Sequence, residues 1–467
     1  MSIKLSPQQD VAITAFQNWY KNLPPREFSH EEYKVTPDGQ QEVVPVYTRG
    51  FTDGAPFFLL EGFAGTGKST VLPYLVEATG LNASQIWFCS PTGKAAKVMT
   101  KKLEAEEIYR AATTIHKAIY RPKMLQAFQI ESELETSQAL YKSAVSRGDA
   151  MAIKELKNKI AQLEKNLDRA YDENAPKFQL ETGSNIQSSH LIVVDECSMV
   201  DADMAEDLLS FGVPVLAIGD PGQLPPVSLA GPGFCVRKAD AALTEIHRQA
   251  LDNPIIWASM LIREGKPIPY GTHGNGELVV LDKDDENDPT FDLARDAQII
   301  CGTHERRWQV TRKFRKLLGY NKDRAPKRDE LMMIVKNSRT IGNLVNGTMA
   351  FMTSDVADFE PGRTTFLASI EDDEGQNHTI RCLQATIEEH YLGKNTYSAL
   401  KRDVFRAKQD QRVHELDFAY AITCHKSQGS QWDEVILHDQ SGVFRDSADK
   451  WLYTGLTRAA KRLTVVM

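Results

Sequence analysis

Short, continuous runs of apolar residues mark candidate strands along the chain, and polar or glycine-rich loops follow most of them. The clearest runs cover residues 57–60, 85–90, 191–194, 213–218 and 297–301. Strands that are apolar on both faces are typical of parallel sheets covered by helices on each side. The pattern therefore predicts an α/β fold whose polar loops gather at the carboxyl ends of parallel strands.

Residues 129–172 show a helical period instead. In the second part of this stretch, apolar residues recur at alternating spacings of three and four, as in a heptad seam: Ile153, Leu156, Ile160, Leu163 and Leu167. The first part contains apolar residues that could form a helix facing this seam: Ile130, Leu134, Tyr141 and Val145. This pattern predicts an antiparallel helical hairpin that turns at 146–149. A structural spacer and an arm that separates strands or binds a partner are equally compatible with it.

Two further regions depart from the parallel-strand pattern. Residues 5–22 have the features of a helix capped by Ser6, with Pro7 in its first turn. Residues 331–387 alternate short strands with turns such as Asn346-Gly347. This alternation predicts a small β-barrel inserted in the second half of the chain.

The run at 57–60 leads into a glycine-rich loop and then a helix. Gly62, Gly67, Lys68 and Ser69 fit the phosphate-loop pattern G-x-x-x-x-G-K-[ST], with Gly65 inside the loop. Glycines let backbone N–H groups turn toward a triphosphate, the lysine would neutralise its β and γ phosphates, and the serine would hold Mg²⁺. A glycine-rich turn that binds nothing is the alternative.

Two acids follow the apolar run 191–194. Asp195 is placed to bind Mg²⁺ through water, and Glu196 to orient and deprotonate the attacking water. An acidic strand end that faces solvent would give the same local pattern. Its combination with a phosphate loop favours a site for triphosphate hydrolysis.

Polar side chains elsewhere supply candidates for the same site. Gln9 carries an amide that suits the N6 and N7 atoms of adenine. Gln223, on the loop after the run 213–218, is placed to touch both the γ phosphate and a bound strand. Arg248 and Arg458 are candidates to reach the nucleotide, and we expect Arg458 to stabilise charge on the phosphorus transition state.

The charge of the chain is unevenly distributed. Its net charge is −8, yet residues 94–123 hold eight Lys/Arg against three Glu, and residues 304–339 hold twelve against four acids. Two basic segments on an acidic chain predict one channel for a phosphate backbone, with solvated helix faces as the alternative. The loop 91–97, Pro-Thr-Gly-Lys-Ala-Ala-Lys, follows a strand and is a candidate nucleic-acid contact.

Length and composition bound the remaining classes. At 467 residues, 42% of them hydrophobic, the chain is long enough for three or four structural units. It contains no run of 18 apolar residues and no apolar signal core, so we expect a cytoplasmic protein without membrane contact. The six cysteines form no zinc-like cluster, and reduced, mostly buried thiols are expected.

Eight sequence blocks, taken in order, carry a specific resemblance. They are GFAGTGKST, SPTGKAAK, TIHKAI, VVDECSMVD, GDPGQLPPV, EIHRQ, AITCHKSQGSQWDEVIL and YTGLTRAAKRL. Together they closely resemble superfamily 1 DNA helicases of the RecD/Dda type, whose compact members are frequent in bacteriophages. The similarity extends from Gln9 to Arg462.

The resemblance implies an α/β fold with two RecA-like P-loop NTPase domains that clamp ATP between them. It implies a helical-hairpin insertion in the first domain and an SH3-like β insertion in the second. The first domain would cover 1–118 and 190–235 with its insertion at 119–189, and the second would cover 236–329 and 413–467 with its β insertion and a connecting helix at 330–412. Single-stranded DNA would cross both domains.

The resemblance also implies roles for individual residues. The catalytic set is Lys68, Asp195, Glu196, Gln223, Arg248 and Arg458, and the Mg²⁺ ligands are Ser69 and Asp195. The ATP-binding set is Gln9, Gly62, Ala64, Gly65, Thr66, Gly67, Lys68, Ser69, Thr70 and Gly429. The DNA-binding set is Pro91, Thr92, Lys94, Thr114, His116, Thr423 and His425.

The implied activity is ATP-dependent unwinding of forked or tailed duplex DNA by a monomer that moves 5′ to 3′ on a single strand. A role in replication or recombination, beside proteins of those processes, would follow, in the host cytoplasm if the source is a virus. Two other activities stay open: a DNA-stimulated translocase that displaces proteins without efficient unwinding, and an ATP-gated clamp. The long helical insertion departs from the family's β-hairpin pin, so the strand-separating residue also stays open, with Tyr120 and Phe128 as candidates.

Overall fold

The computed structural model describes residues 5–25, 27–35, 41–48, 55–122, 124–170, 178–246, 252–284, 289–291, 297–320, 323–338, 340–341, 344–393, 403–404, 407–408, 410 and 412–467. The chain divides into two compact units, one made of Met1–Ala118 with Asn185–Met467 and the other of Ile119–Ser184. Within the described ranges, no helix is long and apolar enough to cross a membrane.

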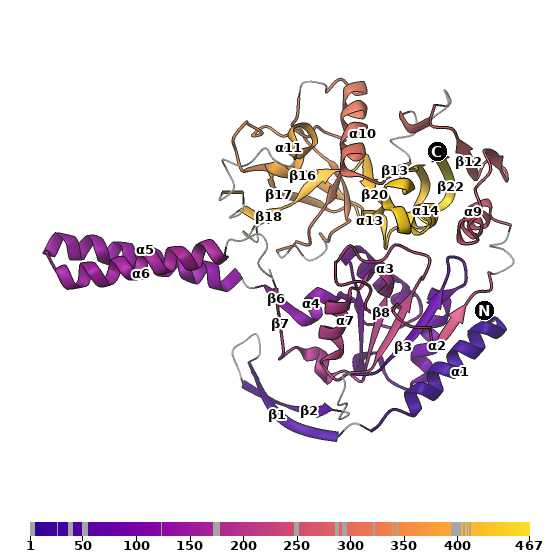
Figure 1. Ribbon diagram of the computed structural model, residues 1–467, viewed down its shortest axis with the longest axis horizontal. Helices are drawn as coiled ribbons and strands as arrows, with labels where there is room; N and C mark the ends of the chain where they lie inside the picture. Colours follow the sequence, from indigo (N-terminus) through magenta and orange to yellow (C-terminus); the bar gives the residue numbers. More distant parts are fainter. Residues whose placement is uncertain are drawn as a thin grey trace. The chain divides into compact units, whose positions relative to one another are not determined.

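A six-stranded parallel sheet organises the first part of the larger unit (Figure 1). Its strands lie in the order β10, β3, β9, β8, β4, β5, and all neighbours run parallel. The bounds are β3 (Phe57–Gly62), β4 (Ile86–Ser90), β5 (Thr113–Thr114), β8 (Leu191–Asp195), β9 (Val215–Gly219) and β10 (Ala241–Leu243). Four of these strands are the apolar runs of the sequence, and β9 is buried along its whole length.

Helices cover this sheet. They are α1 (Pro7–Lys21), α2 (Lys68–Ala78), α3 (Gly93–Ala105), α4 (Ile115–Ile119) and α7 (Ala202–Leu209), with the 3-10 turns η1 (Ala83–Gln85), η2 (Asn185–Ser188) and η3 (Cys197–Met199). As predicted, α1 is capped by Ser6 and has Pro7 in its first turn. Phe16 of α1 packs edge-on against Phe58 of β3, with ring centroids 5.3 Å apart. Outside the sheet, β1 (Glu27–Val35) and β2 (Gln41–Thr48) form an antiparallel pair.

A second six-stranded sheet organises the later part of the larger unit. Its order is β11, β12, β22, β21, β13, β20, and its neighbours run parallel except for β11 and β12. The strands are β11 (Gly271–His273), β12 (Leu278–Leu281), β13 (Gln298–Cys301), β20 (Ala421–Thr423), β21 (Trp432–His438) and β22 (Ala459–Val466). The helices are α9 (Pro254–Arg263), α10 (His304–Leu317), α13 (Cys424–Ser427) and α14 (Ala448–Leu456), with η4 (Pro289–Phe291) and η5 (Ser441–Ser447). The two sheets with their helices are the two RecA-like domains, which confirms the expected fold class.

A third sheet is inserted in the second domain. It is antiparallel except for β17 and β18, in the order β18, β17, β16, β15, β14, β19. Its elements are β14 (Leu331–Ile334), β15 (Met349–Met352), β16 (Thr365–Asp372), β17 (Asn377–Leu383), β18 (Val413–His414) and β19 (Leu416–Phe418), with α11 (Gln384–Leu392) after β17. Among the described residues, β18 and β19 form its two edges rather than closing a barrel. Because these two strands belong to it, the sheet extends past the expected boundary at residue 412.

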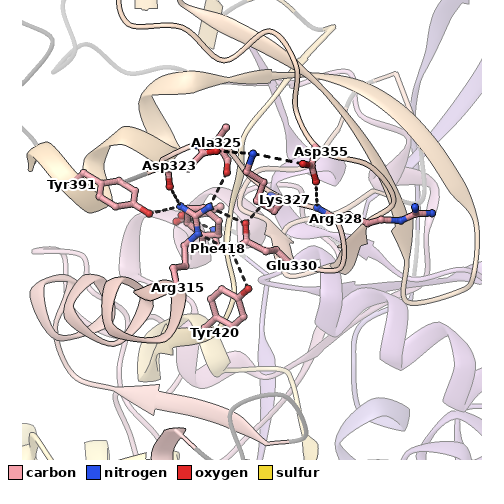
Figure 2. Close-up of polar contacts among 11 residues, drawn as sticks. Arg315, Asp323, Ala325, Lys327, Arg328, Glu330, Asp355, Tyr391, Phe418 and Tyr420 are labelled. Atoms are coloured by element: carbon pink, nitrogen blue, oxygen red, sulfur yellow. Dashed lines mark hydrogen bonds and ion pairs between the residues drawn. The ribbon is translucent and has the colours of Figure 1, made fainter. Parts of the chain in front are cut away.

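A buried ion pair joins α10 to this inserted sheet (Figure 2). Arg315 Nε donates to Glu330 Oε1 at 2.7 Å, and Arg315 Nη2 donates to Glu330 Oε2 at 3.1 Å. The hydroxyl of Tyr420 donates to the same Glu330 Oε1 at 3.0 Å, and Phe418 places its ring centroid 4.6 Å from the guanidinium carbon. Both charged side chains are 1% exposed. A paired, fully hydrogen-bonded charge of this kind fixes two elements in one arrangement.

The prediction of a basic channel is wrong for part of its second segment, residues 304–339. Besides Arg315, Arg307 of α10 is buried and forms an ion pair with Asp417, which also hydrogen-bonds His390. A count of charges along the sequence does not distinguish cations that face solvent from cations that pair in a core. These arginines support the fold.

The smaller unit contains the helical hairpin. Its helices are α5 (Met124–Arg147) and α6 (Ala150–Ala170), and its short strands β6 (Tyr120–Pro122) and β7 (Phe178–Leu180) pair antiparallel. Ser137, Ala144 and Leu163 are buried within the unit, and Gly148 turns the chain with a φ of 70°. The predicted hairpin and its turn at 146–149 are therefore present. Tyr120 is half-buried, and the side chain of Phe128 lies outside the description.

Candidate active site

The phosphate loop has the shape that its sequence predicts. It joins the end of β3 at Gly62 to the start of α2 at Lys68, and Gly65 and Gly67 have φ values of 78° and 80°. Residues with a Cβ rarely adopt these angles. A Cβ on Gly62 would lie 2.8 Å from both Lys68 Cγ and Thr66 Oγ1, so the loop folds closely around the lysine stem. Its backbone N–H groups and the helix N-terminus suit an anion.

The ammonium of Lys68 lies inside this loop. Its Nζ donates to the carbonyl oxygen of Gly62 and, at 3.1 Å, to that of Phe63. The same Nζ lies 3.5 Å from Asp220 Oδ2, whose side chain is 1% exposed. Carbonyl oxygens and one buried carboxylate thus hold the cation inside the loop, as expected of a lysine that binds phosphates.

Glu196 has the backbone and the environment of a strained functional residue. It follows β8 with a φ of 58°, and its backbone N–H donates to Asp195 Oδ1 at 3.0 Å. Its Oε2 is buried and has no hydrogen-bond partner among the described residues. Burial, and next the charge of Asp195, raise the pKa of Glu196, while Arg458 and Lys68 oppose the rise. A carboxylate with a raised pKa suits a general base.

Arg458 and Gln223 are the other predicted catalytic residues that lie within the described part of the chain. Arg458 is buried, and backbone carbonyls hold it: its Nε donates to Thr454 O at 3.0 Å and its Nη1 to Ser430 O at 3.1 Å. Its charge acts on Glu196, which belongs to the other RecA-like domain. Gln223 is also buried, and its Oε1 has no hydrogen-bond partner among the described residues. Arg248 lies outside the described residues.

Two residues that we had not predicted as site residues, Asp220 and Tyr453, connect the phosphate loop to the second RecA-like domain. The hydroxyl of Tyr453 in α14 donates to Asp220 Oδ2 at 2.9 Å and accepts the backbone N–H of Ala64 at 2.8 Å. A Cβ on Gly222 would lie 2.9 Å from the ring of Tyr453, so glycine is needed there for close packing. The available signal was their place in the blocks GDPGQLPPV and YTGLTRAAKRL.

Three other predicted nucleotide residues, Gln9, Ser69 and Thr70, lie at or near the loop, whereas Gly429 lies against α3. Gln9 is buried, its Oε1 accepts the N–H of Ser6 at 2.8 Å, and its Nε2 donates to Thr66 O at 3.4 Å. Its amide therefore braces the phosphate loop. Ser69 Oγ accepts from Lys102 Nζ at 2.8 Å, and the N–H of Thr70 donates to Gly67 O at 3.0 Å.

A cavity of about 640 Å³ opens beside the loop, within the range of ligand sites. Phe63 and Gly222 line it from the first domain, and Arg263, Lys450 and Tyr453 line it from the second. The guanidinium of Arg263 lies over the ring of Phe63. The acids Glu245, Glu264 and Asp449 also line this cleft. A lining of aromatic rings and charged groups of both signs suits a polar ligand with a flat ring, such as a nucleoside.

The three threonines among the predicted DNA-binding residues share one structural role. Thr92 caps α3 by accepting the N–H of Ala95 at 3.2 Å, Thr114 accepts the N–H of Lys117 in α4 at 3.1 Å, and Thr423 caps α13. Each stands at a strand-to-helix turn: Thr92 follows β4, and Thr114 and Thr423 are the last residues of β5 and β20. These strands lie together near one edge of the first sheet and at one edge of the second. Pro91 belongs to the first of these turns.

The remaining candidates gather beside these turns. Lys94 Nζ lies 5.2 Å from the ring centroid of Trp432, and burial lowers its pKa. Burial also lowers the pKa of His116 and of His425, so both imidazoles favour the neutral form. A Cβ on Gly429 would lie 2.9 Å from Ala95 Cβ, which places Gly429 against α3 and its DNA candidates.

The site suits a nucleotide with Mg²⁺. No group of three or more acidic, histidine or cysteine side chains that could hold a metal occurs in the described part of the chain. Mg²⁺ commonly takes one or two protein oxygens together with phosphate oxygens. Ser69 and Asp195 would supply the protein oxygens, and the unpartnered oxygens of Glu196 and Gln223 point to a polar ligand nearby.

Family models match both parts of the chain. Residues 37–275 match the model described as AAA domain, and residues 418–466 match that of the UvrD-like helicase C-terminal domain. The first match covers the phosphate loop, both acids and Gln223. The second covers Thr423, His425 and Arg458.

Two curated proteins are similar in sequence to the chain. The chain is 27% identical over 224 residues to the ATP-dependent RecD2 DNA helicase of Deinococcus radiodurans, covering 47% of this chain and 23% of that protein. It is 24% identical to an uncharacterized protein of Methanocaldococcus jannaschii, covering 96% of this chain and 39% of that protein. The chain thus spans well under half the length of these relatives.

Among solved structures, the chain is similar to that of two coordinating Pif1 helicases at forked double-stranded DNA, with a TM-score of 0.48, 16% identity, and coverage of 100% of this chain and 92% of that one. It is also similar to Bacteroides Pif1 bound to single-stranded DNA, with a TM-score of 0.43 and 18% identity. That match covers 89% of each chain.

Proposed function

The chain belongs to the AAA domain family, and we propose that it is an ATP-dependent DNA helicase of superfamily 1, with a 5′ to 3′ polarity taken from its resemblance to RecD/Dda-type helicases. The observation that carries this proposal is the meeting of groups from two RecA-like domains at one phosphate loop. Lys68 and Glu196 come from the first domain, and Tyr453 and Arg458 come from the second. A site assembled from two domains is completed or broken by their relative motion.

In the proposed hydrolysis, Lys68 binds the β and γ phosphates and Glu196 takes a proton from the attacking water. Arg458 stabilises the charge that develops on the transferred phosphoryl group, and Gln223 contacts the γ phosphate. Mg²⁺, held by Ser69 and Asp195, would neutralise phosphate charge. Removal of such an arginine costs about 10³ to 10⁵ in rate in related chemistry.

The proposed movement couples this site to the strand-to-helix turns that carry Thr92, Thr114 and Thr423. The first two turns belong to one RecA-like domain and the third belongs to the other. Closing and opening of the ATP site would therefore change the spacing of two sets of backbone contacts and shift the grip along the strand. Contacts to phosphate make binding salt-dependent and nearly independent of sequence.

A second candidate, a translocase that displaces proteins but unwinds poorly, is favoured by one observation. In the inserted unit, β6 and β7 have only three residues each, and the other secondary-structure elements between them are the two helices of the hairpin, α5 and α6. A long β-hairpin wedge is absent from the part of this unit that the structure describes.

Strand displacement tests both candidates. Duplexes with a 5′ single-stranded tail, a 3′ tail or no tail are incubated with ATP and the protein, with Lys68→Ala as control. We expect only the 5′-tailed duplex to open, and only with the unmodified protein. ATPase stimulated by single-stranded DNA without any unwinding would support the translocase. DNA-stimulated ATPase that persists in Lys68→Ala would overturn the assignment of the site.

A further inference from the structure

Two thiols lie side by side next to the proposed catalytic base, Glu196. Cys197 Sγ and Cys235 Sγ are 3.9 Å apart. Cys197 is the residue after Glu196 and begins η3, and its side chain is buried. All six cysteines lie within the described residues, and Cys235 is the one that is not buried. One thiol of the pair is therefore accessible to a solvent oxidant and the other is within its reach.

The backbone holds this pair in place. The N–H of Gly233 donates to Val200 O at 2.8 Å, and the N–H of Ala202 donates to Gly231 O at 3.0 Å. These bonds fix the segment before Cys235 to the residues that follow Cys197. The close approach of the sulfurs is therefore built into the fold.

Packing decides which sulfur moves. A Cβ on Gly219 would lie only 2.6 Å from Cys197 Sγ, so this sulfur is packed against the end of β9. Cys235 lies on the connection between β9 and β10, outside any helix or strand. The sulfurs must close from 3.9 Å to about 2.0 Å to bond. We expect Cys235 to supply most of this movement.

We propose that Cys197 and Cys235 form a reversible disulfide when the protein meets a hydroperoxide, and that the bond inhibits ATP hydrolysis; the inhibition rests on the proposed function. The thiolate of Cys235 attacks one peroxide oxygen, which gives a sulfenic acid and, for hydrogen peroxide, one water after protonation. The Cys197 thiol then attacks the sulfenic sulfur, the S–S bond forms, and a second water leaves. Two thiols lose two electrons and two protons, and one peroxide is reduced to two waters.

Inhibition follows from the position of Cys197. Glu196 has a left-handed backbone conformation, and the next residue in the chain would be tied to the connection that leads to β10. Small displacements of a catalytic group are costly, since a shift of about 1 Å can reduce a rate on the order of 100-fold. We expect the disulfide to lower kcat at least about tenfold, with nucleotide binding largely kept.

The test uses the full chain, reduced and then treated with hydrogen peroxide. Non-reducing peptide mapping is expected to show the peptides of Cys197 and Cys235 joined, with the loss of two hydrogen atoms. ATPase is expected to fall on oxidation and to return with dithiothreitol. Cys235→Ser is expected to keep its basal ATPase and to resist peroxide, whereas Cys382→Ser, which removes a buried thiol elsewhere, responds like the unmodified protein.

Two results would overturn the proposal. One is the absence of the joined peptide at peroxide levels that oxidise Cys235. The other is an equal loss of ATPase in Cys235→Ser, which would locate the damage at another residue. Cys197→Ala provides a second variant that cannot form the bond. A protein without ATPase in its reduced form would contradict the proposed function, and the peptide map would still decide whether the bond forms.

Discussion

Tyr453 of the second RecA-like domain donates its hydroxyl hydrogen to Asp220 of the first domain at 2.9 Å. Asp220 in turn lies 3.5 Å from the ammonium of Lys68. The same tyrosine oxygen accepts the N–H of Ala64 in the phosphate loop. The position of α14 and the position of Lys68 are therefore linked through two polar contacts.

Tyr453→Phe removes this link without changing the shape of the ring. A hydrogen bond to a charged group contributes about 1.5 to 3 kcal/mol, and we expect ATPase to fall about 10-fold or more. The matched control is Tyr420→Phe, because Tyr420 also donates to a buried carboxylate, Glu330, at 3.0 Å. That variant is expected to lose stability and keep its kcat.

DNA-stimulated ATPase and thermal unfolding of both variants check this prediction. A Tyr453→Phe protein with unchanged kcat would show that Asp220 holds Lys68 without help from the second domain. An equal loss of kcat in Tyr420→Phe would mean that reduced overall stability, and not the loss of the Tyr453–Asp220 hydrogen bond, causes the effect.

The pH dependence of ATPase is expected to report Glu196. The base acts as a carboxylate, so activity is lost as pH falls through its pKa. Burial and Asp195 raise that pKa, and the acidic limb is therefore expected above the usual range of a glutamate. Arg458 lowers the pKa, so Arg458→Ala should reduce the rate and move the limb of the residual activity to higher pH.

The control for this shift is Arg462→Ala, which removes an exposed arginine that pairs with Glu434 at 3.0 Å. Its profile of kcat against pH should match that of the unmodified protein. If the limb of Arg458→Ala stays in place, Glu196 is not the titrating base. Glu196→Gln should lower kcat by about 10² to 10⁴ while ATP binding persists.

Arg315→Ala is expected to destabilise the larger unit. The substitution leaves Glu330 as an unpaired carboxylate that is 1% exposed, and breaking a buried pair costs about 3 to 5 kcal/mol. Denaturant unfolding measures this loss. Arg328→Ala, an exposed arginine in the same region (Figure 2), should change the free energy of unfolding by less than about 0.5 kcal/mol. Equal effects would contradict the structural role of Arg315.

Replacing residues 131–171 by a short linker is expected to leave DNA-stimulated ATPase within about a factor of two, because most of the removed residues form a compact unit of their own. Strand displacement is measured on the same variant. If strand displacement falls while ATPase is kept, the hairpin is needed for unwinding. Loss of soluble protein would instead show that the hairpin belongs to the folding core.

Local patterns predicted those parts of the protein that depend on local sequence. Strands β3 and β8 are continuous apolar runs because a parallel sheet buries both of their faces. The phosphate loop could be predicted from the sequence because Gly65 and Gly67 adopt left-handed backbone angles that favour glycine, and Lys68 follows Gly67 directly.

Contacts between distant residues could not be predicted in this way. Tyr453 and Asp220 are 233 positions apart, and neither has a pattern of its own; only the packing of two sheets brings them together. Arg315 belongs to a basic run in the sequence, yet it is buried against Glu330. Gln9 likewise braces Thr66 with the amide that we expected on adenine.

The chain returns from the inserted sheet to the second RecA-like sheet through only two residues, Ala419 and Tyr420, between β19 and β20. Both are buried, and Ala419 donates its N–H to Leu331 O and accepts from Gln298 Nε2. A chimera that exchanged the inserted sheet with that of a relative would cut through a shared core at this point. For protein engineering, we expect the helical hairpin to be exchangeable as a compact unit, whereas the inserted sheet must be transferred together with its host domain.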